Sequence, residues 1–117
     1  MSLRIVIGEN EPDLVAYYCL IATRLGHDVV ALATNGWELV TRCAEQRPDL
    51  VITEVRLPRI DGLEAMRNIK DHALFIVASA IEELPDDPEL RRRIVAHLVK
   101  PFQRAQLEDA IAAAAVR

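Results

Sequence analysis

Short apolar segments alternate with longer segments of helical periodicity along the whole chain, and this alternation constrains the fold more than any other feature. The short segments are rich in β-branched residues, whereas the longer ones repeat apolar residues every three or four positions. Strands are predicted over residues 3–7, 28–33, 50–53, 74–78 and 96–99. Helices are predicted over 12–26, from the turn at 34–36 to 46, over a short stretch containing 63–69, over 87–94 and from 103 onward. Strands that are apolar on both faces and separated by helices predict a doubly wound α/β sandwich around a parallel sheet.

Proline and glycine mark the ends of several predicted helices. Pro12 suits the first turn of a helix and Gly26 the position after its last turn, so the first helix is predicted between them. Asp87 is predicted to cap a later helix, with Pro88 in its first turn. From its three- and four-residue spacing, the buried face of the first helix is predicted to contain Leu14, Tyr18, Ile21, Ala22 and Leu25.

Size and charge exclude several classes of protein. The 117 residues suffice for one domain with its own core and are too few for two, so a single domain is expected over residues 1–117. The formal net charge of −4 argues against direct nucleic-acid binding, because neutralising phosphates requires a basic surface. No apolar run approaches the ~18 residues of a membrane span and no secretory leader is recognised, so a cytoplasmic protein without membrane contact is expected. Cys19 and Cys43 lie in helical apolar patterns and are expected to be reduced and buried.

Polar residues follow the predicted strands at the sheet edge where doubly wound folds bind ligands. Glu9 and Asn10 follow the first strand, and Glu54 follows the third. Ser79 follows the fourth strand, and Lys100 follows the fifth. Strand ends are often polar because they meet solvent, but acids, a hydroxyl and an amine gathered at one edge predict a functional site.

Five segments of the chain resemble the landmarks of response-regulator receiver domains. They are residues 8–12 (GENEP), 48–54 (PDLVITE), 57–62 (LPRIDG), 78–80 (ASA) and 98–102 (LVKPF), and the resemblance covers essentially the whole chain. It implies a flavodoxin-like (βα)5 fold with a five-stranded parallel sheet in the order 2-1-3-4-5. It also implies a non-enzymatic role in two-component phosphorelay signal transduction, through a Mg²⁺-dependent aspartyl-phosphate site that controls the face formed by the fourth helix, fifth strand and fifth helix.

The resemblance implies an acidic, metal-binding pocket. Glu9 and Asn10 take the positions of its acidic pair, and the backbone of Arg56 lies at a further position of the metal site. Asn10 departs from the family pattern, because its neutral amide replaces the usual second acid. Since Mg²⁺ normally depends on carboxylates, we expect any Mg²⁺ binding to be weak and no other cofactor to be present.

Glu54 takes the position of the phospho-acceptor, where the family has aspartate, and Lys100 that of the ammonium that contacts the phosphoryl group. Glutamate adds one methylene and moves the attacking oxygen by about 1.5 Å, and a misplacement of that size can cost about a hundredfold in rate. The longer Glu54 side chain is also expected to reach toward Lys100 as a phosphoryl oxygen would. We therefore expect Glu54 to hold a partly activated-like state.

The remaining landmarks concern the conformational switch. Ser79 takes the position of the switch hydroxyl, and His97 stands where the family usually has a switch Tyr or Phe. The peptide bond before Pro101 is expected to be cis, as in the family. The segment from Gly62 to Leu74 is short for the family, which predicts either a truncated third helix or a changed approach to the fourth strand.

The leading hypothesis is an atypical receiver, or pseudo-receiver, that acts through protein–protein contacts. Its expected partners are a histidine kinase, a phosphotransfer protein or an effector at the helix 4–strand 5–helix 5 face, and a homodimer is left open. The alternative is a working Mg²⁺-dependent receiver. A third hypothesis from another class is a small carboxylate-dependent hydrolase that uses Glu9, Glu54 and Lys100 with a metal. A flavin-binding flavodoxin is disfavoured, because the acidic loop at residues 9–12 would repel a phosphate.

Overall fold

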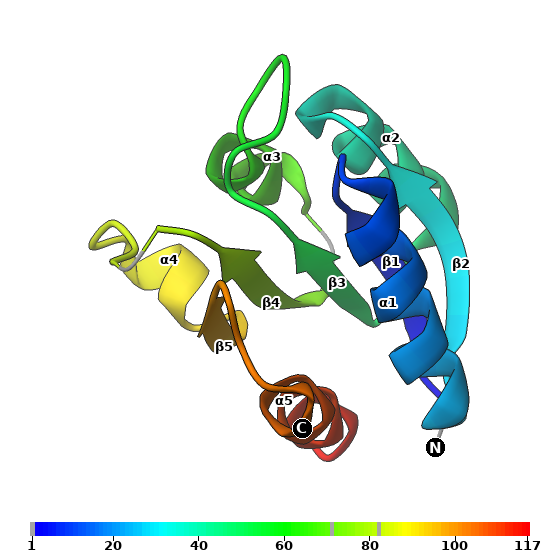
Figure 1. The fold of residues 1–117 in the computed structure, drawn as a ribbon. Helices are drawn as coiled ribbons and strands as arrows, with labels where there is room; N and C mark the ends of the chain where they lie inside the picture. The colour runs from blue at the N-terminus through cyan, green and yellow to red at the C-terminus, as the bar shows by residue number, and fades with distance from the viewer. Residues whose placement is uncertain (1, 71, 82) are drawn as a thin grey trace.

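The computed structural model describes residues 2–70, 72–81 and 83–117. It contains one five-stranded parallel sheet in the order β2-β1-β3-β4-β5, with helices in the crossovers (Figure 1). The predicted flavodoxin-like doubly wound fold is therefore confirmed. The strands are β1 Arg4–Gly8, β2 Asp28–Ala33, β3 Leu50–Thr53, β4 Leu74–Ser79 and β5 Ile94–Val99. The helices are α1 Pro12–Arg24, α2 Gly36–Gln46, α3 Gly62–Asn68, α4 Pro88–Arg91 and α5 Arg104–Ala115.

The sheet separates two apolar cores, because successive strand side chains point to opposite faces. Ile5, Ile7 and Ile52 pack into one core with residues of α1 and α5. Val6 and Val51 pack into the other with residues of α2, α3 and α4. The inner strands β1, β3 and β4 are therefore buried on both faces, as expected for a parallel sheet in a doubly wound fold, whereas the edge strands β2 and β5 are mostly half-buried.

The strand register brings the carboxyl ends of four strands to one edge of the sheet. Gly8 at the end of β1 pairs with Thr53 at the end of β3, and Ser79 at the end of β4 pairs with Val99 at the end of β5. The residues that follow these positions therefore emerge side by side. This edge holds all of the predicted pocket residues.

The fourth helix is shorter than predicted. The sequence predicted a helix from Asp87 to Ile94, but α4 ends at Arg91 and Ile94 already belongs to β5. Arg93 explains the early end: its side chain donates hydrogen bonds to the carbonyl groups of Ile69 and Ala73 and lies 4.6 Å from the centre of the Phe75 ring. These contacts draw the chain onto the sheet, where β-branched residues such as Ile94 are favoured.

Two other predictions about buried residues are partly wrong. In α1, Tyr18, Ile21 and Ala22 are buried as predicted, but Leu14 is only half-buried and Leu25 is 39% exposed. The helix ends at Arg24, so Leu25 lies beyond its last turn, and Gly26 follows with a φ of 86° that suits glycine. Cys43 is buried and Cys19 only partly so. The short third helix is confirmed, since α3 has seven residues.

Candidate functional site

Glu9 forms the floor of the candidate site at the end of β1. Its side chain is 1% exposed, and its Oε1 accepts a hydrogen bond from Lys100 Nζ at 2.9 Å. Its Oε2 accepts the backbone N–H groups of Asn10 at 3.1 Å and Glu11 at 3.2 Å. A carboxylate buried to this degree requires such partners, and Glu9 has one for each oxygen.

Glu54 follows β3 and faces the same ammonium group. Its Oε2 lies 3.2 Å from Lys100 Nζ, an ion-pair contact whose angles fall outside hydrogen-bond geometry. Its Oε1 accepts a hydrogen bond from Ser79 Oγ at 3.2 Å and a long one from the Arg56 backbone N–H at 3.4 Å. The structure thus brings together Glu9, Glu54, Ser79 and Lys100, four of the five side chains that the strand ends predicted.

Lys100 bridges the two acids from the end of β5. Burial works to lower the pKa of Lys100, but the carboxylates of Glu9 and Glu54 outweigh it and the pKa is raised overall. Lys100 therefore stays protonated, and the three charged groups sum to about −1. The same negative charges reach Tyr18, whose pKa is raised by burial and then by Glu9 and Glu54.

The loop after β3 is held tightly around Glu54. The backbone N–H of Glu54 donates to the Gly8 carbonyl at 2.9 Å, and Thr53 Oγ1 donates to the Glu54 carbonyl at 3.0 Å. Gly62 then packs directly on that carbonyl, because a Cβ at residue 62 would lie 2.1 Å from the Glu54 carbonyl oxygen. The sequence indicates Gly62 only as part of a family motif and does not predict this packing role.

The other predicted site residues are placed less centrally. The Asn10 side chain is exposed, and Asn10 reaches the pocket through its backbone N–H. His97 is half-buried on β5, and its Nε2 is buried without a hydrogen-bond partner among the described residues. The peptide bond between Lys100 and Pro101 is cis, as expected.

The groups that could act as metal ligands in this pocket do not fit a resident Mg²⁺ ion. In residues 2–70, 72–81 and 83–117, no three acidic, histidine or cysteine side chains gather as metal ligands. Both oxygens of Glu9 and both of Glu54 already face protein donors. Arg56 presents its N–H to the pocket, whereas a ligand role would use its carbonyl oxygen. The exposed Asn10 amide adds no charge.

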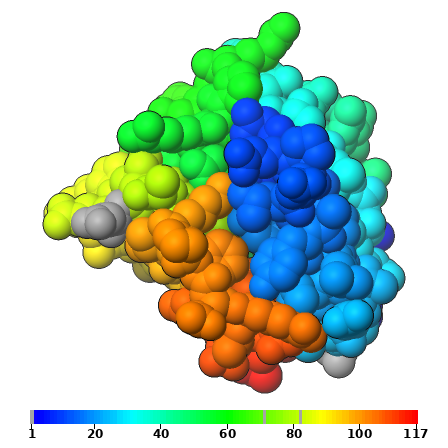
Figure 2. Space-filling model, viewed as in Figure 1, coloured from blue at the N-terminus to red at the C-terminus, as the bar shows by residue number. Residues whose placement is uncertain are grey.

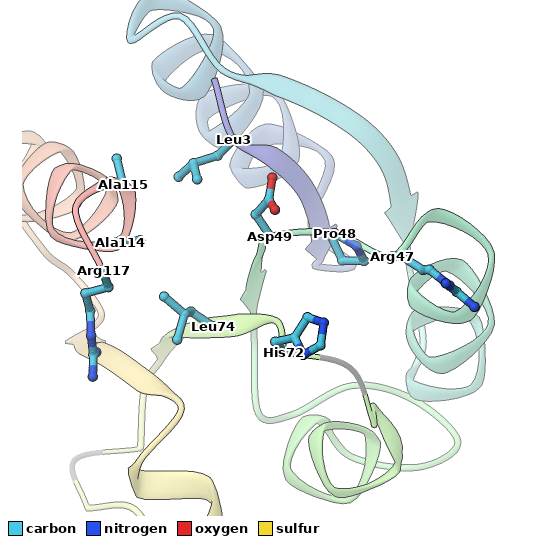
Figure 3. A pocket seen from close by; sticks show the side chains of 9 residues that line it. All are labelled: Leu3, Arg47, Pro48, Asp49, His72, Leu74, Ala114, Ala115 and Arg117. Atoms are coloured by element: carbon cyan, nitrogen blue, oxygen red, sulfur yellow. The ribbon is translucent and has the colours of Figure 1, made fainter. Parts of the chain in front are cut away.

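One hollow lies beside the site and another lies far from it. A mainly apolar groove of about 360 Å³ is lined by Leu14, Tyr17, Lys100, Pro101 and Phe102. Figure 2 shows this surface, where α1 meets the segment that follows β5. A second hollow of about 320 Å³ lies at the opposite end of the sheet, beside residues that begin β4 or precede β1 and β3 (Figure 3). Its Arg47 and Arg117 side chains point away from each other, so they form no joint anion site.

Comparison with known proteins decides the family. The family described as the response regulator receiver domain matches residues 5–112. The chain belongs to this receiver-domain family. Among curated relatives, the chemotaxis protein CheY of Thermotoga maritima is 32% identical over 95% of this chain and 96% of its own length. The transcriptional regulatory protein PdtaR of Mycobacterium tuberculosis is 34% identical over 97% of this chain but only 57% of its own length.

Solved structures agree with this assignment. A LuxR-family two-component response regulator from Aurantimonas has a TM-score of 0.83 and 27% identity, covering 100% of this chain and 88% of its own. The response regulator PhyR from Brucella abortus has a TM-score of 0.82 and 22% identity, and the match covers 97% of this receiver chain and 48% of PhyR. The receiver domain thus spans about half the length of some relatives. In its described part, each helix is too short or too polar to cross a bilayer.

Proposed function

We propose that this receiver domain is an atypical one, in which Glu54 does not serve as an efficient phospho-acceptor and the output is protein–protein contact in phosphorelay signalling. The observation that carries the proposal is Lys100 Nζ, which lies 2.9 Å from Glu9 Oε1 and 3.2 Å from Glu54 Oε2. A nucleophilic carboxylate needs an oxygen free to align with the phosphorus atom of a donor. Both Glu54 oxygens are already turned toward protein donors.

The same contacts support a partly activated-like state. Ser79 and Lys100 are the residues that the family would use to bind a phosphoryl group, and here both contact Glu54. The Glu54 carboxylate imitates only part of a phosphoryl group, because it has fewer oxygens and less charge. Glu54 is therefore proposed to hold Ser79 near its switched position without any phosphoryl transfer.

A groove beside β5 supports a partner site on the α4–β5–α5 face. The groove, of about 470 Å³, is lined by Glu83, Leu84, Arg91 and the residues 94–97 of β5. The single turn of α4 leaves those β5 side chains half-buried. The proposed partner at this face is a cytoplasmic protein: a histidine kinase, a phosphotransfer protein, an effector or a second copy of this chain. Arg91 and Arg92 already pair with Asp86 and Glu89, so they contribute no unpaired charge.

A working receiver is the second candidate, and one observation favours it. Glu9, Ser79 and Lys100 surround Glu54 in the arrangement that phosphoryl transfer would use. A phosphoryl donor would then have to draw Glu54 away from Lys100. No contact of the described residues favours the hydrolase hypothesis over these two.

Replacing Glu54 with glutamine tests whether its charge holds the switch. In Glu54→Gln, we expect changes of backbone amide shifts at residues 79–81, 94–100 and 102, because the amide attracts Lys100 less strongly. The measurement is a comparison of ¹H–¹⁵N spectra with the wild type. Glu45→Gln is the matched control, since Glu45 pairs with Arg42 on the surface of α2. Shift changes confined to the immediate neighbours of residue 54 would contradict the proposal.

A further inference from the structure

We infer that the Lys100 ammonium is the resident cation of this pocket, so that wild-type protein takes up no divalent metal ion there. The inference deepens the proposed function, on which its regulatory meaning rests, and its test is independent of phosphoryl transfer. The ammonium pairs with both acids, because Lys100 Nζ lies 2.9 Å from Glu9 Oε1 and 3.2 Å from Glu54 Oε2. The consequence is a pocket whose state does not follow the Mg²⁺ concentration.

The oxygen atoms of the two acids carry the argument. Glu9 Oε2 accepts hydrogen bonds from two backbone N–H groups, and Glu54 Oε1 accepts them from Ser79 Oγ and the Arg56 N–H. The other two oxygens, Glu9 Oε1 and Glu54 Oε2, both face Lys100 Nζ. A divalent ion held by the two acids would have to compete with the ammonium, which already contacts both of these oxygens.

The length of Glu54 explains how one lysine reaches both acids. The extra methylene of glutamate carries its carboxylate about 1.5 Å farther than that of aspartate. Glu54 Oε2 is thereby placed 3.2 Å from Lys100 Nζ while Oε1 stays on Ser79 Oγ. The residue that weakens phosphoryl acceptance therefore also completes the ammonium site.

The surroundings of Lys100 keep its ammonium group in place. The lysine shares its groove with the apolar side chains of Leu14, Tyr17 and Phe102, which suit an aliphatic stem. Its side chain is only 22% exposed, so most of the lysine lies out of solvent. Mg²⁺ gives up its water shell reluctantly and would have to displace this cation from both carboxylates.

Removing the lysine should create a metal site. We expect wild-type protein to show no saturable amide shift change up to about 20 mM MgCl₂, whereas Lys100→Met binds Mg²⁺ at least about tenfold more tightly. The readout is the set of ¹H–¹⁵N shifts of Asn10, Glu11 and Arg56, whose N–H groups contact the two acids. Lys70→Met is the control, because Lys70 is an exposed residue outside the pocket and should behave as the wild type.

Two results would overturn the inference. One is saturable Mg²⁺ binding by the wild type below about 20 mM MgCl₂, and the other is no gain in the variant. If Lys100→Met does not fold, as judged by circular dichroism, Lys100→Gln is tested in its place, and the wild-type titration is decisive without either variant. No phosphoryl donor is added, so the result is separate from whether Glu54 accepts a phosphoryl group.

Discussion

Glu54→Asp is expected to accept a phosphoryl group from acetyl phosphate about a hundredfold faster than the wild type in the presence of Mg²⁺. The shorter side chain withdraws the carboxylate by about 1.5 Å, away from the Lys100 ammonium that now lies 3.2 Å from Glu54 Oε2. One carboxylate oxygen is then free to align with the donor. The measurement is the time course of the phosphorylated species in intact-protein mass spectra.

The control for this variant shortens an acid elsewhere on the same domain. Glu45→Asp changes an exposed glutamate of α2 and is expected to react no faster than the wild type. Adding Asn10→Asp to Glu54→Asp restores the second acid of the family pattern and should increase the rate again at limiting Mg²⁺. Wild-type protein that is phosphorylated as fast as Glu54→Asp would show that Glu54 is no obstacle to the reaction.

Gly62→Ala is expected to lower the free energy of unfolding by about 3 kcal/mol, at the upper end of the cost of overpacking a core. An added Cβ would lie 2.1 Å from the Glu54 carbonyl oxygen and 3.1 Å from the Val55 Cα. These are backbone atoms, which cannot rotate away as a side chain could. The loop that carries Glu54 must shift, so both stability and the Glu54 contacts should suffer, and urea denaturation measures the first effect.

Gly26→Ala is the matched comparison for Gly62→Ala. At Gly26 an added Cβ meets no atom within 4 Å, but φ is 86°, so only backbone strain of about 1–2 kcal/mol is expected. The two variants therefore separate steric collision from conformational strain. Equal stability of Gly62→Ala and the wild type would mean that the loop moves freely, contrary to the tight packing around Glu54.

The sequence predicted the strands well because their physical pattern is local. The ranges 28–33 and 50–53 agree with β2 and β3. In β3 the apolar residues are buried on both faces, which leaves little choice of structure. The end of α4 was mispredicted because it depends on Arg93, whose partners Ile69 and Ala73 lie more than 15 residues away along the chain. A tertiary contact of that kind has no local sequence pattern.

The pocket residues were predictable from topology, but their contacts were not. Parallel strands end at one edge, so Glu9, Glu54, Ser79 and Lys100 had to lie near one another. The sequence also predicted that Glu54 would reach toward Lys100. It did not predict that Lys100 would bridge to Glu9, because that contact depends on side-chain rotamers and on the partners of each oxygen.

The most direct test of the central claim is the ¹H–¹⁵N spectrum of the wild-type domain with Mg²⁺, before and after addition of beryllofluoride. Beryllofluoride serves here as a non-covalent substitute for a phosphoryl group on the acceptor carboxylate. With Glu54 Oε2 beside Lys100 and Oε1 on Ser79, we predict no change at residues 79–81, 94–100 or 102. Saturable changes across those residues in the wild type would contradict the account and identify the protein as a working receiver.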